Sequence, residues 1–267
     1  MSSAGSDRDS RRSTAAHVAP SGVEGRHIAS AQDQLFRDRG SAREKYSALV
    51  VGRPGWLALI RHELVVMLSQ HLPGAFGLVM RRTLYPLLLG RCGRNVIFGQ
   101  NVVLRHPHKI EIGDNVVVDD NCLLDAKGDA NRGIRIGTGV FIGRNTILSC
   151  KNGDIELADG ANVGFNCEIF SAGHVSIGKD VLIAAYAYII GGDHDATDAA
   201  TPVLAQGRRA AGVAIGDGAW IGAGAKILDG VRIGARAIVG AGAVVRAAVP
   251  DGATAVGVPA RIVKTQG

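Results

Sequence analysis

The segment Gly191-Gly192-Asp193-His194-Asp195 places one histidine between two carboxylates. A neutral imidazole titrates near neutral pH, so it can take a proton from a hydroxyl and later return it to a leaving group. A carboxylate against the ring would orient it and stabilise the charged form. That the two aspartates are adjacent to His194 in sequence does not by itself place either carboxylate against the imidazole ring. His194 is therefore the candidate base, and the alternative is a solvated polar loop that happens to contain a histidine.

The cysteines predict no chemistry of their own. Cys92, Cys122, Cys150 and Cys167 form no CxxC pair and no Cys/His group with the spacing of a zinc site. Neither Ser nor Cys stands in a recognisable nucleophile motif, so we expect no covalent intermediate. Residues 1–30 also lack the apolar core of a signal peptide. We expect a reducing, cytoplasmic location.

The element that must position His194 is a repeat of six residues. From residue 215 an aliphatic residue recurs every sixth position, and the residue four further on is always small or β-branched. The aliphatic positions are Ile215, Ile221, Ile227, Ile233, Val239 and Val245. The positions four residues later are Ala219, Ala225, Val231, Ala237, Ala243 and Val249.

The same period occurs earlier in the chain, in groups of three. The spacing inside each group is six, and the spacings between groups are 12, 9, 8 and 26. Extra residues therefore enter only after every third hexapeptide. The groups are Ile112, Val118, Leu124; Ile136, Ile142, Leu148; Leu157, Val163, Ile169; and Ile177, Ile183, Ile189, preceded by Phe98 and Leu104.

This pattern predicts a triangular solenoid in which three hexapeptides make one turn. Each side is a short strand, and each corner needs Gly, Asn or Asp for a sharp turn. A narrow prism accepts one aliphatic residue with a small one beside it, which accounts for 37 glycines in 267 residues and for only 4% aromatic residues. Helices and ordinary sandwiches lack a period of six. Cys122 and Cys167 occupy the small inward position, so we expect them in the core.

The repeat resembles that of the hexapeptide-repeat acyltransferases over residues 92–267. The resemblance implies a left-handed parallel β-helix, here of about six to seven coils, within a homotrimer. Gly257-Val258-Pro259-Ala260-Arg261 is similar to the close of the family's β-helix. The position of His194, at the root of a loop insertion over residues 191–212, resembles that of the catalytic base in the sugar and antibiotic O-acetyltransferases.

The resemblance also implies acetyl-CoA, or another acyl-CoA, as co-substrate. In the family it lies between two neighbouring β-helices, where small residues admit its pantetheine arm and basic residues meet its phosphates. The matching small residues are Ala223 and Ala241, and the matching basic residues are Arg246, Arg261 and Lys264. Arg246-Ala247 stands where the family often has Thr-Lys, so the charge lies one position earlier. Plain steric filling of the repeat is the alternative for both alanines.

A zinc-dependent carbonic anhydrase shares this fold and uses three histidines. His106, His108, His174 and His194 are available, but two histidines five residues apart, the ligand spacing of that relative, are absent. We therefore expect no metal.

The front of the chain differs in composition and charge. Residues 1–111 carry 16 Lys/Arg and 8 Asp/Glu, a net charge of +8, whereas residues 112–267 carry 14 and 16, a net charge of −2.

Residues 1–42 are polar, and we expect a flexible arm. Residues 43–91 predict two amphipathic helices separated at Pro73-Gly74. They fit either a cap on the first coil or a membrane-surface anchor on the inner face of the membrane, and no apolar run is long enough to span a bilayer. A nucleic-acid partner is not expected, because no basic-aromatic binding motif is present.

These observations predict an enzyme that transfers an acetyl or other acyl group from acyl-CoA to a hydroxyl of a sugar, a polysaccharide precursor or a small metabolite. His194 would act as general base in a direct attack. The alternative is a non-catalytic trimeric β-helix that serves as a scaffold or interaction module. The residues leave open which acceptor is used, whether an amine replaces the hydroxyl, and how long the acyl chain is.

Overall fold

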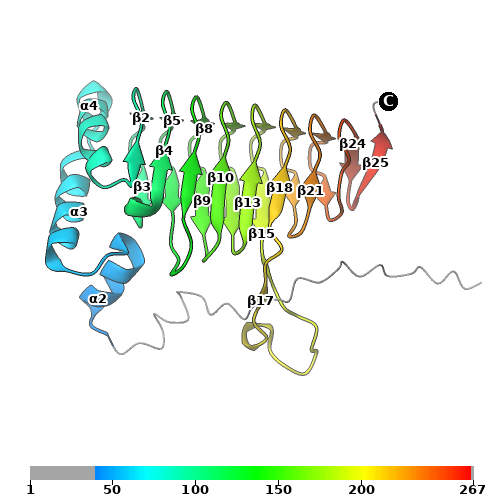
Figure 1. Cartoon of the computed structure of the whole chain (residues 1–267), viewed down its shortest axis with the longest axis horizontal. Coiled ribbons are helices and arrows are strands. Elements are labelled where there is room, and N and C mark those ends of the chain that lie inside the picture. The colour runs from blue at the N-terminus through cyan, green and yellow to red at the C-terminus, as the bar shows by residue number, and fades with distance from the viewer. Residues whose placement is uncertain (1–39, 266–267) are drawn as a thin grey trace, which may run out of the picture.

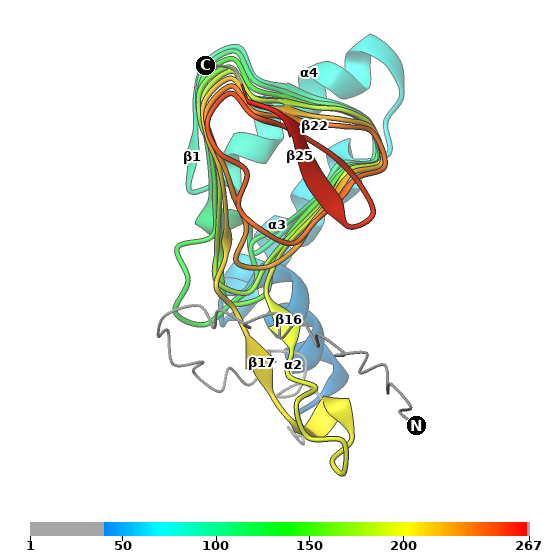
Figure 2. The same cartoon turned by 90° about the vertical axis from the view of Figure 1, so that its right-hand side faces the viewer.

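The computed structural model describes residues 40–265. The predicted arm over residues 1–42 lies outside the described residues except for its last three positions. The described chain is a parallel-strand solenoid with a short helical segment at one end and a hairpin that projects from one corner (Figures 1 and 2).

Three parallel sheets form the sides of the prism, and each successive coil adds one strand to each sheet. The first sheet contains β1 (Arg91–Cys92), β4 (Ile110–Ile112), β7 (Ile134–Ile136), β10 (Asp154–Leu157), β13 (His174–Ile177), β18 (Val213–Ile215) and β21 (Arg232–Ile233). The second contains β2 (Ile97–Phe98), β5 (Val117–Val118), β8 (Phe141–Ile142), β11 (Asn162–Val163), β14 (Leu182–Ile183), β19 (Trp220–Ile221), β22 (Ile238–Val239) and β24 (Thr254–Gly257), with β25 (Ala260–Lys264) at its edge. The third contains β3 (Val103–Arg105), β6 (Leu123–Asp125), β9 (Ile147–Cys150), β12 (Glu168–Ser171), β15 (Tyr188–Gly191), β20 (Lys226–Ile227) and β23 (Val244–Val245).

The prism is a left-handed parallel β-helix, the fold that the family resemblance implied, with seven complete coils and the start of an eighth. The count exceeds the predicted six to seven slightly. The first coil is built around Phe98 and Leu104, where the repeat is only partial, and β24 opens the last coil beyond the final regular hexapeptide. Hydrogen bonding to the neighbouring coil, rather than a perfect hexapeptide, is enough to add a turn.

The core is the interior of the prism. Every repeat position predicted to point inward is at most 5% exposed, from Phe98 at one end to Val245 at the other. The small positions beside them are equally buried, including Cys122 and Cys167. The strand register aligns the inward aliphatic residues of successive coils, so that Ile169 lies next to Leu148 and Ile189 on the neighbouring coils. The predicted inward period is confirmed.

The corners use the residue types that the repeat predicted. Asn101, Asn121, Asn145 and Asn166 adopt φ between 54° and 59°, in the left-handed region that Asn tolerates. Their side chains continue the stacking between coils, because the Asn101 amide donates to Asn121 at 3.1 Å and the Asn145 amide donates to Asn166 at 3.0 Å. The extra residues between groups all enter at the corner that leads from the third sheet to the first.

The segment before the prism contains α2 (Ala42–Tyr46), the π-helix η1 (Ser47–Val51), α3 (Trp56–Ser69), α4 (Gly74–Leu84) and the 3-10 turn η2 (Tyr85–Leu87). Helices α3 and α4 lie against the first coil and form one end of the molecule (Figure 1). Tyr85 is buried beneath them, where its hydroxyl donates to the carbonyl of Val102 at 2.8 Å and its ring meets Phe98 edge-on. Within residues 40–265, no helix has the length and apolarity needed to cross a bilayer.

The other end of the prism is closed by the chain itself. Strand β25 turns back antiparallel on β24, pairing Arg261 with Val256 and Lys264 with Thr254. Figure 2, which looks along the prism from this end, shows β25 lying across the last coil. The predicted closing motif, residues 257–261, supplies this turn, and its Val258–Pro259 peptide bond is cis.

Candidate functional site

The long insertion is a hairpin that leaves the prism at the shared corner. Strand β16 (Asp193–His194) pairs antiparallel with β17 (Arg208–Arg209), so that His194 lies opposite Arg208. Gly192 begins the departure with φ 150°, and a Cβ at this position would come within 2.5 Å of the Ala172 side chain. A glycine is therefore required at this point, and His194 follows it on the first residues outside the prism.

Polar side chains inside the loop hold its shape. The Gln206 amide accepts a hydrogen bond from the Asp198 backbone N–H at 2.9 Å, and it donates to the carbonyls of Asp198 at 2.7 Å and Thr201 at 2.6 Å. At the base, Arg209 forms an ion pair with Asp195 at 3.1 Å. These contacts give the hairpin a defined conformation beside the rigid third sheet.

Neither neighbouring carboxylate contacts the His194 imidazole. Asp193 Oδ1 accepts the backbone N–H of His194 itself at 2.7 Å, while Asp195 binds Thr197 and Arg209. The His194 side chain is exposed. Within residues 40–265 its ring makes no hydrogen bond, so it is free to meet a group from outside this chain.

A pocket of about 120 Å³ lies beside His194, between the hairpin and the outer face of the third sheet. Its floor is aromatic, since the rings of Phe170 on β12 and Tyr188 on β15 lie 5.8 Å apart. Two cations, Lys151 and Arg208, are part of its lining. The residues that line it are Lys151, Phe170, Ala172, Tyr188, Ile190, Gly192, Asp193, His194 and Arg208.

The pocket changes the acid–base properties of two of its own side chains. Partial burial, together with the positive charges of Arg208 and Lys127, lowers the pKa of Lys151 below its usual value. Partial burial, together with the negative charges of Glu168 and Asp193, raises the pKa of the Tyr188 phenol. Lys151 Nζ also lies 5.3 Å from the centre of the Phe170 ring, where a cation is attracted to the ring face.

Lys151, Phe170, Tyr188 and Arg208 were missed in the sequence because each looks like an ordinary surface position. Phe170 and Tyr188 each stand next to an inward repeat residue and so point outward. The available signal was the scarcity of aromatic residues, since two of them occur at outward positions on neighbouring coils, just before the long insertion. Arg208 is brought opposite His194 only by the pairing of β16 with β17.

The predicted coenzyme residues lie elsewhere on the chain. Ala223 and Ala241 are exposed, and they stack on neighbouring coils at the corner between the second and third sheets, where the Gly242 N–H donates to the Ala223 carbonyl at 2.8 Å. Ala185 continues this column on the preceding coil, since its carbonyl accepts the Gly224 N–H at 2.9 Å. The three alanines form a stripe without bulky side chains, consistent with a close approach by a ligand or simply with packing of the repeat.

The predicted phosphate-binding residues are exposed, and within residues 40–265 they form no ion pair. Arg246 follows β23 at the same corner from which the hairpin leaves, and Arg261 and Lys264 belong to β25. None of these residues, and neither alanine, lines the pocket beside His194. A single chain therefore does not gather the predicted base and the predicted coenzyme contacts into one cavity.

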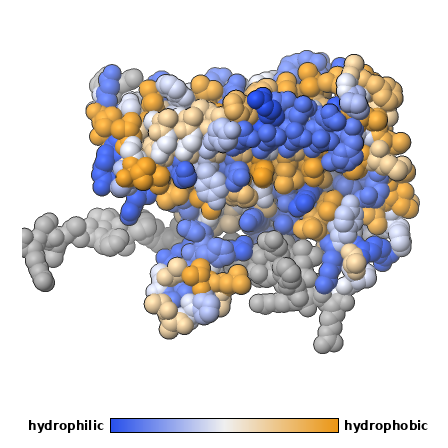
Figure 3. All heavy atoms as spheres, turned by 180° about the vertical axis from the view of Figure 1, so that it is seen from behind, coloured by the Kyte–Doolittle hydropathy of each residue, from blue (hydrophilic) through white to orange (hydrophobic). Residues whose placement is uncertain are grey.

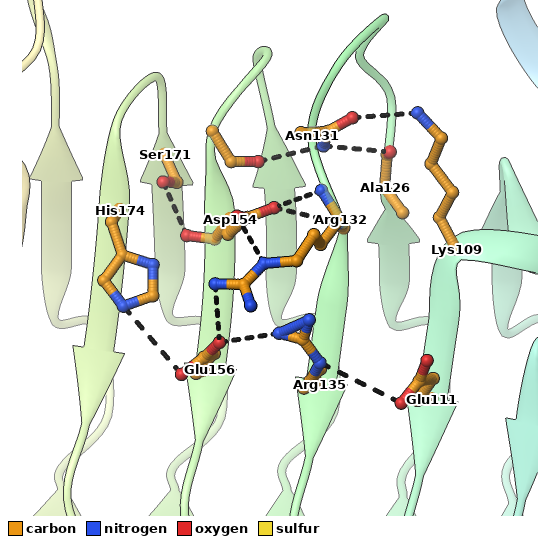
Figure 4. A network of polar contacts seen from close by, with 12 residues as sticks. Lys109, Glu111, Ala126, Asn131, Arg132, Arg135, Asp154, Glu156, Ser171 and His174 are labelled. Atoms are coloured by element: carbon orange, nitrogen blue, oxygen red, sulfur yellow. Dashed lines mark hydrogen bonds and ion pairs between the residues drawn. The ribbon is translucent and has the colours of Figure 1, made fainter.

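The remaining histidines have structural surroundings. His106 is buried, and one ring nitrogen bonds the Ala48 carbonyl at 2.8 Å, while the ring stacks on His108 at 6.1 Å. His174 joins a polar network on the outer face of the first sheet, 3.9 Å from Glu156, which also binds Arg135 at 2.7 Å (Figure 4). Within residues 40–265, no three His, Cys, Asp or Glu side chains gather into a group suited to a metal ion.

Comparison with known proteins gives one curated relative, a probable acetyltransferase of Mycobacterium tuberculosis. It is 35% identical over 133 residues, which cover 50% of this chain and 44% of the relative. The chain thus spans less than half of the length of that relative.

Solved structures share the fold. A polysialic acid O-acetyltransferase superposes with a TM-score of 0.53 at 22% identity, covering 66% of this chain and 86% of that one. An N-acyltransferase from Bacillus cereus, in complex with dTDP and 3-hydroxybutyryl-CoA, superposes with a TM-score of 0.51 at 23% identity, covering 74% and 91%.

The family model of the bacterial transferase hexapeptide, with its six repeats, matches residues 212–247. These residues form the coils that follow the hairpin, where the period of six is most regular. The repeat and the fold of this chain are thus similar to those of the hexapeptide-repeat acyltransferases, and the family model matches the chain over these coils.

Proposed function

We propose that this chain transfers an acetyl or other acyl group from acyl-CoA to a hydroxyl of a saccharide or a small metabolite, with His194 as the general base. The observation that carries the proposal is the position of His194. It stands on a short paired strand at the edge of a pocket. Within residues 40–265, no group forms a hydrogen bond with its ring. A base that must meet a substrate hydroxyl needs this combination of a fixed backbone and an open ring.

In the reaction, one proton moves from the hydroxyl to the thiol sulfur while an oxygen–carbon bond forms and the carbon–sulfur bond breaks. The hydroxyl oxygen attacks the thioester carbonyl carbon, and the imidazole of His194 takes the hydroxyl proton. As the carbon–sulfur bond breaks, the imidazolium gives this proton to the departing sulfur, which leaves as free thiol. A base in this role contributes about 10²–10⁴-fold in rate. No acyl-enzyme is required.

Acyl-CoA as donor is supported by the relatives. The N-acyltransferase of similar fold was crystallised with 3-hydroxybutyryl-CoA. In this chain Ala223 and Ala241 form the stripe along which a pantetheine arm would lie, and Arg246, Arg261 and Lys264 are exposed cations for its phosphates. Because these residues do not line the pocket beside His194, we propose a homotrimer in which one subunit's His194 faces the coenzyme groove shared with the next.

The proposal is tested by incubating the protein with acetyl-CoA and a panel of saccharide hydroxyl and amine acceptors, and by measuring free thiol release together with acylated product. Acceptor-dependent thiol release supports it, and the panel distinguishes O-acylation from N-acylation. If no acyl donor and acceptor pair releases thiol above the rate of spontaneous hydrolysis, the proposal fails.

The second candidate function, a non-catalytic trimeric scaffold, predicts a different thermal behaviour. A protein that binds acetyl-CoA gains about 2.7 kcal/mol of stability when the ligand is present at a hundred times its Kd. A scaffold that has lost the activity gains none. Thermal unfolding with and without acetyl-CoA therefore separates the two functions before any acceptor is known.

A further inference from the structure

Lys151 and Arg208 both line the pocket beside His194, where Asp193 is the one carboxylate in the lining. Within residues 40–265, neither side chain takes part in an ion pair. Their neighbours do, since Lys127 lies 3.8 Å from Asp125 and Arg209 lies 3.1 Å from Asp195. Burial lowers the pKa of Lys151, and the positive charge of Arg208 lowers it further, so the two cations repel each other across the pocket.

The carboxylate nearest to them in the pocket lining is already engaged. Asp193 Oδ1 accepts the backbone N–H of His194 at 2.7 Å, and Asp193 forms no ion pair with Lys151 or Arg208. The other lining groups are the two aromatic rings, Ala172, Ile190 and Gly192, which carry no charge. An anion placed between Lys151 and Arg208 would relieve their repulsion and would receive charge-assisted hydrogen bonds from both.

We propose that the pocket binds the anionic group of the acceptor, a carboxylate or a phosphate, and that Lys151 and Arg208 thereby hold the neighbouring hydroxyl at His194. This inference rests on the proposed function for the role of His194. Phe170 and Tyr188 provide the apolar face on which the carbon skeleton of the acceptor lies. The acceptor class is therefore an acidic or phosphorylated saccharide rather than a neutral one.

The test measures binding by calorimetry in the absence of acyl-CoA, with glucuronic acid, glucose 1-phosphate and glucose as probes. We expect the two anionic sugars to bind and glucose to bind at least tenfold more weakly, because contacts to charged groups are the strong ones. The comparison of glucuronic acid with glucose 1-phosphate shows which anion the pocket prefers. Lys151→Gln and Arg208→Gln should each weaken binding of the preferred anion by about tenfold or more.

Lys179→Gln is the matched control, because Lys179 is an exposed lysine at another corner of the prism and the charge change is the same. Equal binding of all three sugars to the wild-type protein would overturn the proposal, as would equal effects of the pocket variants and the control. His194→Ala separates the two proposals. It should lose at least about a hundredfold in acyl transfer while the contacts of Lys151 and Arg208 with the anion remain. Anion binding by the wild-type protein without any acyl transfer counts against the proposed function alone.

A second inference rests on a different surface, the outward face of α3. The inward face, with His62, Val65 and Ser69, is buried on the first coil. The opposite face is apolar as well, with Leu57 85% exposed and Met67 69% exposed. The exposed apolar residues recur at helical spacing and continue onto α4; they are Trp56, Leu57, Ile60, Leu64, Met67, Leu68, Phe76 and Val79.

This surface, the apolar end, is the terminal face of the molecule. Figure 3 shows apolar side chains gathered along the edge that α3 and α4 form. Exposed cations border it, namely Arg43, Arg53, Arg61 and Arg82, and residues 40–90 carry six Lys/Arg against two Glu, a net charge of +4. Exposed apolar side chains bordered by arginines are the composition of helices that lie in a membrane interface.

We infer that the apolar end docks on a membrane surface that contains anionic lipid, with the axis of the prism directed away from it. The positive border distinguishes this occupant from a second copy of the same face, because two such faces would bring like charges together. The inference is independent of the reaction at His194, since it concerns only the helical end.

Sedimentation with vesicles tests it, using phosphatidylcholine alone and phosphatidylcholine with phosphatidylserine. We expect the full chain to bind the anionic vesicles, and Ile60→Gln with Leu64→Gln to remove most of that binding. Leu204→Gln, at an 80% exposed apolar position in the hairpin, is the control and should bind normally. Absence of binding to anionic vesicles overturns the inference. So does self-association that the α3 variants abolish, because the occupant is then a second copy.

Discussion

Arg81 Nε donates a hydrogen bond to the carbonyl oxygen of Phe98 at 2.9 Å, and this bond joins helix α4 to the first coil of the prism. The same guanidinium donates through Nη1 to the carbonyls of Ser69 at 3.1 Å and Leu72 at 2.7 Å, at the end of α3. Arg81 is 3% exposed and, within residues 40–265, has no carboxylate partner. The buried guanidinium of Arg81 thus connects α4 to backbone oxygens of the first coil, of α3 and of the turn that follows α3.

Replacing Arg81 with Leu should therefore loosen the helical end. The substitution leaves buried carbonyls without donors, and each costs about 1–3 kcal/mol. We expect the free energy of unfolding to fall by about 3 kcal/mol or more, measured by denaturant titration at fixed protein concentration. Arg82→Leu is the control, because Arg82 is the exposed neighbour on the same helix and should change stability by less than about 0.5 kcal/mol. Equal losses in the two variants would show that the contacts of Arg81 are not responsible.

Replacing His194 with Ala tests the proposed base. The variant should lose at least about a hundredfold in turnover, because proton transfer from the hydroxyl no longer has an acceptor. Turnover is measured as thiol release, and oligomeric state by size-exclusion chromatography with light scattering should be unchanged. His174→Ala is the control, since His174 is an exposed histidine on the first sheet. Near-normal turnover of His194→Ala would exclude this residue as the base.

Acid should weaken the attachment of the helical segment through His106 and His108. Burial lowers the pKa of both, and for His108, which also lies near Arg53, the pKa falls to about 4. In the unfolded chain these residues take up a proton near pH 6.5. The unfolded state then binds more protons, so stability is fully present above about pH 6.5 and is lost as the pH falls toward 4.

The measurement is the urea midpoint at pH 7.5 and at pH 5.0, for the wild-type protein and for His108→Gln. The glutamine cannot take up a proton, so the variant should lose less stability between the two values. A loss as large as that of the wild-type protein would assign the acid sensitivity to other groups.

Three of the four cysteines should react with a thiol reagent only as the protein unfolds. All four are free thiols, and Cys122, Cys150 and Cys167 are fully buried. Burial raises the pKa of Cys122 to about 12 and raises that of Cys150 further, so little reactive thiolate forms. We expect three cysteines to resist labelling in the native protein and four to react in denaturant. Rapid native labelling of Cys122 would place it outside the core.

The prism was predictable because one short period determined both packing and geometry. Each inward residue, such as Ile183 or Ile221, repeats the same local requirement, so its burial follows from its place in the series. The corner at which loops enter followed from the insertions after every third hexapeptide. The number of coils was harder, since the coil around Phe98 and Leu104 has weak repeats and is held by pairing with its neighbour.

The surroundings of His194 were less predictable for a physical reason. The hairpin is held by contacts between residues that are separated in sequence, such as Arg209 with Asp195, and no periodic pattern predicts these contacts. The sequence suggested Asp193 or Asp195 as a partner for the imidazole. Instead, Asp193 accepts a hydrogen bond from the backbone N–H of His194, and Asp195 accepts one from Arg209. Lys151 reaches the pocket from another coil, where only the stacking of the prism makes it a neighbour.

The single corner at which every insertion leaves the prism has a consequence for how such a chain changes over time. The other two corners are fixed by stacked turns, but this one already accommodates segments from a few residues up to the hairpin. Sequence and length there can vary while the core remains intact. The chain thus combines a sterically constrained core with one corner at which segments of different length can be exchanged without disturbing the stacked coils.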